Sequence, residues 1–148
     1  MKVFKFTLQS LLNVKNTMEK QQKAELAAAN ARLAALRQEL EVILLDLAGQ
    51  KTEYFRALNG GELTPSDLQM WSVGFKVMRE RINLQKKKIE TAEGEQRRAQ
   101  RKVIETMKER KMLEKLKERQ LAEYRIAQAA EDAAAVDEFL SAKIHMEG

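Results

Sequence analysis

Residues 59–67 read Asn59-Gly60-Gly61-Glu62-Leu63-Thr64-Pro65-Ser66-Asp67, and they form the strongest interruption of helical sequence in the chain. The Asn-Gly-Gly run permits positive φ angles and typically ends a helix. Thr64 then has the pattern of an N-cap, Pro65 suits the first helical position, and Asp67 resembles the acidic member of a capping box. The stretch therefore predicts a turn that separates two helices.

The sequence on both sides of this turn has the composition of long helices. Of the 148 residues, 33% are charged and only 5% aromatic; Pro occurs once and Cys never. A β-sandwich or barrel needs many more turn, β-branched and aromatic residues, and Ala, Leu, Glu, Lys, Arg and Gln are typical of coiled coils. We predict a single coiled-coil domain over 1–148, with a helix over 6–58, a turn over 59–64 and a helix over 65–142.

Residues that are apolar except for three glutamines recur at alternating spacings of three and four on both sides of the turn, which is the a/d pattern of a coiled coil. The first set is Leu26, Ala29, Leu33, Leu36, Leu40, Ile43, Leu47, Gln50, Tyr54 and Ala57. The second set is Trp71, Phe75, Met78, Ile82, Gln85, Ile89, Ala92, Gln96, Ala99 and Val103. When the chain is folded at the glycine pair, positions whose numbers add to 125 face each other, so that Ile43 meets Ile82 and Leu36 meets Ile89. One common register predicts an all-α fold: a long antiparallel two-helix coiled-coil hairpin.

Two places depart from this register. Between Lys15 and Gln22 the first seam turns polar, and Lys15 would face Arg110 with like charge, which predicts a stutter in the heptads. The pairing also exhausts the first helix near residue 117. Residues 118–148 are therefore expected to overhang without an intramolecular partner, and their apolar side chains are Leu121, Tyr124, Ile126, Val136, Phe139 and Leu140.

The net charge of +5 is unevenly distributed along the chain. Residues 76–125 carry 17 basic and 9 acidic side chains, whereas residues 126–148 carry 1 basic and 5 acidic ones. A basic middle suggests an anionic partner, because summed charge steers association. The alternative, a solvated basic helix face, stays open.

No arrangement of residues suggests enzymatic chemistry. The one histidine, His145, lies near the C-terminus, and without cysteines or a second histidine it cannot form a usual zinc site. The glycines form no phosphate-binding loop, and the carboxylates have the spacing of surface ion pairs. We expect no enzyme activity, no cofactor, no metal and no small-molecule substrate. The N-terminus lacks the pattern of a secretory signal and no run is long enough to span a bilayer, which favours the cytoplasm.

Four aromatic residues lie close to the turn: Tyr54, Phe55, Trp71 and Phe75. They could close the open end of the seam. They could also form part of a partner-binding patch, because two helices are too thin to bury four rings.

The opening Phe4-x-Phe6-x-Leu8-x-x-Leu11-Leu12, followed by a helix rich in Lys, Glu and Gln, is similar to the start of flagellar FliJ proteins. The length, the hairpin pattern, Glu53-Tyr54 before the turn and Asp137-Glu138-Phe139 in the acidic tail also resemble that family.

This resemblance implies a non-enzymatic component of the flagellar type III export apparatus, similar to the central stalk of rotary ATPases. The two chain ends would enter the hexameric export ATPase ring and promote its assembly and activity. The part nearer the turn would contact the cytoplasmic domain of the export gate, and export chaperones would also bind. The protein would be cytoplasmic and associated with the membrane at the flagellar basal body only through these partners.

Two groups of residues follow as candidate contact surfaces. The gate surface would comprise Leu47, Tyr54, Trp71, Phe75, Met78 and Ile82. The ATPase surface would comprise Phe4, Phe6, Leu8, Leu11, Leu12, Leu121 and Tyr124.

The basic runs leave a second class of function open, a generic coiled-coil scaffold or a nucleic-acid-binding hairpin. Lys86-Lys87-Lys88 and Arg97-Arg98 could contact phosphates. No aromatic residue is interleaved with them and no known nucleic-acid-binding pattern appears. Phe4 to Leu12 could alternatively form a short membrane-surface face.

Overall fold

The computed structural model describes residues 3–147 and contains two helices, α1 over Gln9–Gly60 and α2 over Pro65–Glu147. The two helices pack against each other and no strand occurs among residues 3–147, which confirms the predicted all-α helical hairpin. The chain divides into two compact units. Unit 2 is Gln21–Val103, and unit 1 combines Met1–Lys20 with Ile104–Gly148. No helix within the described part of the chain is long and apolar enough to cross a membrane.

The turn in unit 2 uses the glycine and the capping residues that the sequence predicts, but α1 continues to Gly60, two residues beyond the expected end at 58. Gly61 has a φ of 70° and is the one residue with positive φ among those described. The backbone N–H of Thr64 donates to Asp67 Oδ2 at 3.1 Å, and the N–H of Asp67 donates to Thr64 Oγ1 at 3.2 Å. This reciprocal capping box satisfies two amide groups at the start of α2, which fixes the point at which the second helix begins.

Replacement of Gly61 by alanine is expected to destabilise the hairpin by about 1–2 kcal/mol, because a Cβ atom is strained at positive φ. Gly49 provides the matched control, since it lies within α1 and a Cβ atom there would meet nothing within 4 Å. Gly49→Ala should stabilise the protein by about 0.5–1 kcal/mol through helix propensity. Urea unfolding followed by circular dichroism measures both, and equal shifts for the two variants would contradict this role for Gly61.

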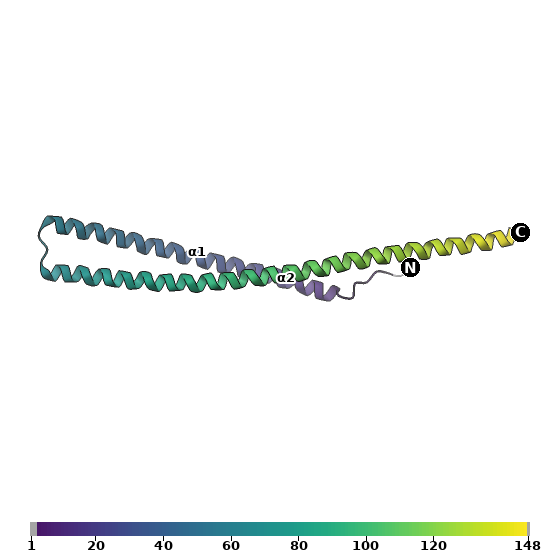
Figure 1. Ribbon diagram of the computed structural model, residues 1–148, viewed down its shortest axis with the longest axis horizontal. Helices are drawn as coiled ribbons and strands as arrows, with labels where there is room; N and C mark the ends of the chain where they lie inside the picture. Colours follow the sequence, from purple (N-terminus) through teal and green to yellow (C-terminus); the bar gives the residue numbers. More distant parts are fainter. Residues whose placement is uncertain (1–2, 148) are drawn as a thin grey trace. The chain divides into compact units, whose positions relative to one another are not determined.

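The core of unit 2 lies along the predicted seam, where α1 and α2 run side by side from the turn (Figure 1). One buried cluster joins Leu33 with Ile89 and Ala92, against which Leu36 and Leu40 pack. A second cluster nearer the turn joins Ile43 with Met78 and Ile82, against which Leu40 and Leu47 pack. Both clusters contain the residues that the common register brings together, so the predicted pairing is confirmed at these positions.

Gln85 places a polar side chain in this seam without leaving it unsatisfied. It is 5% exposed, and its Nε2 donates to the carbonyl oxygen of Leu36 at 2.9 Å and to Glu39 Oε2 at 3.0 Å. A buried amide with partners on the opposite helix favours one register, because sliding the helices would break both hydrogen bonds.

Unit 1 corrects the prediction of like-charge repulsion and of a stutter. Lys15 forms an ion pair with Glu109, and Arg110 pairs with Glu19 and also, at 2.9 Å, with Glu114. Glu19 is only 6% exposed, so the seam keeps its alternating spacing with charged residues in place of apolar ones. The hydrogen bonds that Arg110 donates to the carboxylates of Glu114 and Glu19 raise the pKa of Arg110, since they stabilise its charged form.

Unit 1 also corrects the predicted start of the first helix and of the overhang. Residues 3–6 are not helical, and α1 begins at Gln9 rather than at residue 6. Phe4 and Phe6 are two positions apart, and side chains at this spacing point to the same side of a non-helical, strand-like segment but to different sides of a helix. Phe4 packs on Tyr124 with ring centroids 5.6 Å apart, Phe6 is buried, and Leu121 is partly buried. The fully exposed part of α2 therefore begins near residue 129 and continues to Glu147, beyond the expected end at 142.

Candidate partner-binding sites

Three of the aromatic rings near the turn form one cluster within the seam of unit 2, and we call these three the tip cluster. The ring of Tyr54 lies 5.6 Å from Trp71 and 5.4 Å, edge-on, from Phe75, and Trp71 stacks on Phe75 at 5.9 Å. All three are partly buried, so they close the end of the seam and still leave part of their surface accessible to solvent. Phe55 contacts Tyr54 at 5.7 Å but lies outside the seam and is 59% exposed.

The candidate gate residues differ in how far solvent reaches them. Met78 and Ile82 are 5% and 7% exposed and belong to the core cluster around Ile43. Leu47 is partly buried and packs against that cluster, while the tip cluster offers more exposed surface. A partner that leaves the hairpin closed would therefore touch the tip cluster and Phe55, and would reach Met78 and Ile82 only at their edges.

The candidate ATPase residues at the N-terminus fall into two sets. Phe6 and Leu12 are buried within unit 1, and Phe4 is partly buried against Tyr124. Leu8 and Leu11 are exposed, at 37% and 43%. The buried set holds the N-terminal segment on α2, and the exposed set remains available to another protein.

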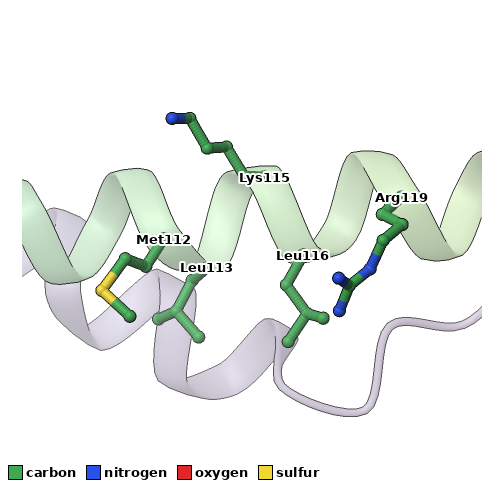
Figure 2. Close-up of a pocket in the computed structure, with 5 residues that line it drawn as sticks. All are labelled: Met112, Leu113, Lys115, Leu116 and Arg119. Carbon is green, nitrogen blue, oxygen red and sulfur yellow. The ribbon is translucent and has the colours of Figure 1, made fainter.

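A shallow hollow lies beside this segment on α2 (Figure 2). It is lined by Met112, Leu113, Lys115, Leu116 and Arg119. Figure 2 shows Leu113 and Leu116 pointing toward the first turns of α1, whereas Lys115 points away from them. Met112 is 70% exposed, which adds an apolar side chain to the accessible surface of unit 1. The alternating three-and-four spacing does not predict this hollow, because Met112, Lys115 and Arg119 lie outside that spacing.

The end of α2 presents the longest unpartnered helical face in the described chain. Every residue from 129 to 147 is exposed, and we call this segment the tail. Val136, Leu140 and Ile144 are spaced four apart and are 56%, 49% and 69% exposed, so they form an apolar stripe on one side of the helix. Phe139, next to this stripe, is 69% exposed. Acidic residues make up most of the charge around the stripe.

No group of three or more His, Cys, Asp or Glu side chains within residues 3–147 has an arrangement that could hold a metal ion. What the described surface offers is exposed apolar area: the tip cluster with Phe55, the edge of the N-terminal segment, and the tail.

A scan against protein-family models matches the family described as Flagellar FliJ protein over residues 4–147. The chain belongs to the FliJ family. It is therefore a component of the flagellar export apparatus, in a family of non-enzymatic export proteins. The match begins at Phe4, the first residue of the opening pattern that resembles this family, and it includes the turn and the tail. Neither the curated proteins nor the solved structures contain a match to the chain.

For a FliJ protein the three exposed surfaces are candidate contacts with other parts of the export machinery. The FliJ match covers both ends of the hairpin, so it favours none of these surfaces over another.

Proposed function

We propose that this FliJ protein acts as a stalk-like coiled coil that binds the export ATPase ring through its chain ends and promotes assembly and activity of the ring. The tail carries this proposal. A lone helix gains little by exposing Val136, Phe139, Leu140 and Ile144 to water, and it becomes stable when a partner covers such a stripe. Leu8 and Leu11 supply further exposed apolar area in the same unit.

The residues around the turn of unit 2 form a second candidate contact surface. We propose that the tip cluster and Phe55 contact the cytoplasmic domain of the export gate, because Trp and Tyr side chains are enriched among the residues that supply most of the binding energy at protein interfaces. Export chaperones are proposed as further partners. Association with the cytoplasmic face of the membrane at the basal body would then be peripheral and would depend on these proteins.

Size-exclusion chromatography with multi-angle light scattering tests the ATPase part of this proposal. The protein is measured alone and then with the flagellar ATPase under conditions in which the ATPase forms rings. We expect coelution in a complex with the mass of a ring plus the stalk. Separate elution of the protein and the ATPase under the conditions in which the ATPase forms rings would contradict the proposal.

The gate contact can be tested with the double variant Tyr54→Ala, Phe75→Ala. We expect about a tenfold or greater loss of affinity for the cytoplasmic domain of the gate in a calorimetric titration, because two aromatic side chains are removed from one patch. Leu45→Ala serves as the control, since Leu45 is an exposed apolar residue of α1 outside the tip cluster. Circular dichroism should show that both variants keep their helical content, and equal affinities for the gate would contradict the tip contact.

A further inference from the structure

One flank of unit 2 contains a groove between α1 and α2 that lies beside the seam. The residues that line it are Glu39, Val42 and Ile43 of α1 and Arg81, Leu84, Gln85 and Lys88 of α2. Ile43 and Gln85 are buried at its base, whereas Val42 and Leu84 are 49% and 56% exposed on its walls. We call this feature the flank groove.

The apolar wall of the flank groove continues along α2 toward the turn. Met70, Val73 and Val77 lie 14, 11 and 7 residues before Leu84, which places all four on one face of the helix. Met70 is 72% exposed, and Val73 and Val77 are each 55% exposed. A second hollow touches this face and is lined by Ser66, Gln69, Met70, Val73 and Gly74. These side chains form a stripe of about four helical turns that no residue of the described chain covers.

Two glycines open the same flank to close approach. Gly74 borders the second hollow, and Gly49 lies two turns after Val42 on the corresponding face of α1. A Cβ atom at either position would meet nothing within 4 Å, so packing within the hairpin does not require glycine there. Each glycine costs a helix about 1 kcal/mol relative to alanine. A glycine at each position leaves room for the backbone of another helix to approach closely, which is a physical reason for glycine rather than alanine there.

The charges on the groove indicate what kind of helix fits. Arg81 and Lys88 line the α2 wall, and neither forms an ion pair within residues 3–147. On the α1 wall, the carboxylate of Glu39 already accepts a hydrogen bond from Gln85. That hydrogen bond leaves Glu39 negatively charged, so carboxylates of an incoming protein are attracted to the α2 wall, where Arg81 and Lys88 have no ion-pair partner among the described residues, and repelled from the α1 wall.

We propose that the flank groove binds an amphipathic helix of another protein, with its apolar face against Val42, Val77 and Leu84 and a row of carboxylates beside Arg81 and Lys88. A helix laid on this flank would complete a three-helix bundle, which is a common way to cover an apolar helix face. The proposal goes beyond the ATPase and gate contacts, because the groove shares no residue with the tail and lies outside the tip cluster.

Fluorescence anisotropy with the full chain and two designed helical peptides of about 21 residues tests this proposal. Both peptides carry Leu and Ala on one face and Ser on one edge; on the other edge one peptide has Glu and its twin has Lys, so that the charged edge can lie along the α2 wall and away from Glu39. We expect the Glu peptide to bind about tenfold or more tightly than the Lys peptide at low salt. The double variant Arg81→Glu, Lys88→Glu should reverse this order. Equal binding of both peptides, or no binding of either, would overturn the proposal.

Gly74→Leu separates binding from folding. Leucine should fill the second hollow beside Met70 and Val73, where the bound helix would continue, and weaken binding of the Glu peptide by about tenfold or more. The helix should become no less stable, because leucine is the better helix former. Gly94→Leu is the matched control, since Gly94 lies in the same helix outside the groove and a Cβ atom there meets only arginine side-chain ends at 3.9 Å. Unchanged peptide binding by Gly74→Leu would overturn the proposal. So would sedimentation showing a dimer of the chain that Gly74→Leu converts to monomer, because the occupant would then be a second copy.

Discussion

Deletion of residues 129–148 is expected to abolish stimulation of the flagellar ATPase and to leave the rest of the protein folded. Each described residue in this range is exposed, so the deletion removes no core packing. The contact between Phe4 and Tyr124 and the buried Phe6 stay in place, which keeps the N-terminal segment on α2. The ATPase rate in the presence of the truncated chain should equal the rate of the ATPase alone.

The apolar stripe can be tested separately from the length of the tail. The triple variant Val136→Ser, Leu140→Ser, Ile144→Ser should lose most of the stimulation, because it removes the apolar side chains and keeps the charges. A control that neutralises Glu131, Asp137 and Glu138 to the corresponding amides should keep the maximal stimulation and change mainly its salt dependence. Normal stimulation by the truncated chain would reject the tail as the ATPase contact.

Ile82→Asp is expected to destabilise unit 2 by about 4 kcal/mol, since it removes a core side chain and leaves a charge without a partner in the seam. Leu84→Asp makes the same chemical change two residues away, where the side chain is 56% exposed. This control should shift stability by only about 0.5 kcal/mol. Urea unfolding followed at 222 nm measures both variants, and a similar loss for the two would contradict the assignment of Ile82 to the seam.

The apolar seam and the turn could be predicted from the sequence because each rests on a local rule that repeats. The alternating spacing of three and four runs from Leu26 to Ala57 and again from Trp71 to Val103, and every residue of both sets is at least partly buried. The positive φ of Gly61 and the capping box between Thr64 and Asp67 depend only on residues within a few positions of each other, so the local sequence is enough to predict them. No long-range packing competes with these signals.

In unit 1 the structure differs from the sequence-based prediction where the contacts are made by long charged side chains or by residues far apart in sequence. The predicted register places Lys15 opposite Arg110. Each of these side chains is long enough to reach a residue of the other helix that is not directly opposite. Lys15 therefore finds Glu109, and Arg110 finds Glu19. The extended segment around Phe4 was not predicted either, because its conformation is stabilised by Tyr124, which is 120 residues away in sequence.

The candidate contact residues were chosen from the sequence by residue type and by distance from the turn or the chain ends. Their exposure to solvent depends on whether each one lies inside or outside the seam, which the sequence shows less clearly. Met78 and Ile82 lie in the middle of the seam, whereas Phe55, one residue after Tyr54, lies outside it. The a/d spacing does not predict the flank groove, because the residues on its walls lie outside the a/d positions. The spacing of Met70, Val73, Val77 and Leu84 was the signal that could have revealed it.

Site-specific photocrosslinking in the assembled export apparatus tests the central claim most directly, namely that the two ends of this hairpin bind different partners. A photoreactive phenylalanine analogue is placed at Phe139 in the tail or at Phe55 near the turn, two exposed positions of the same residue type. We expect position 139 to crosslink to the ATPase and position 55 to crosslink to the gate. Crosslinks from position 55 to the ATPase together with none from position 139 would contradict it.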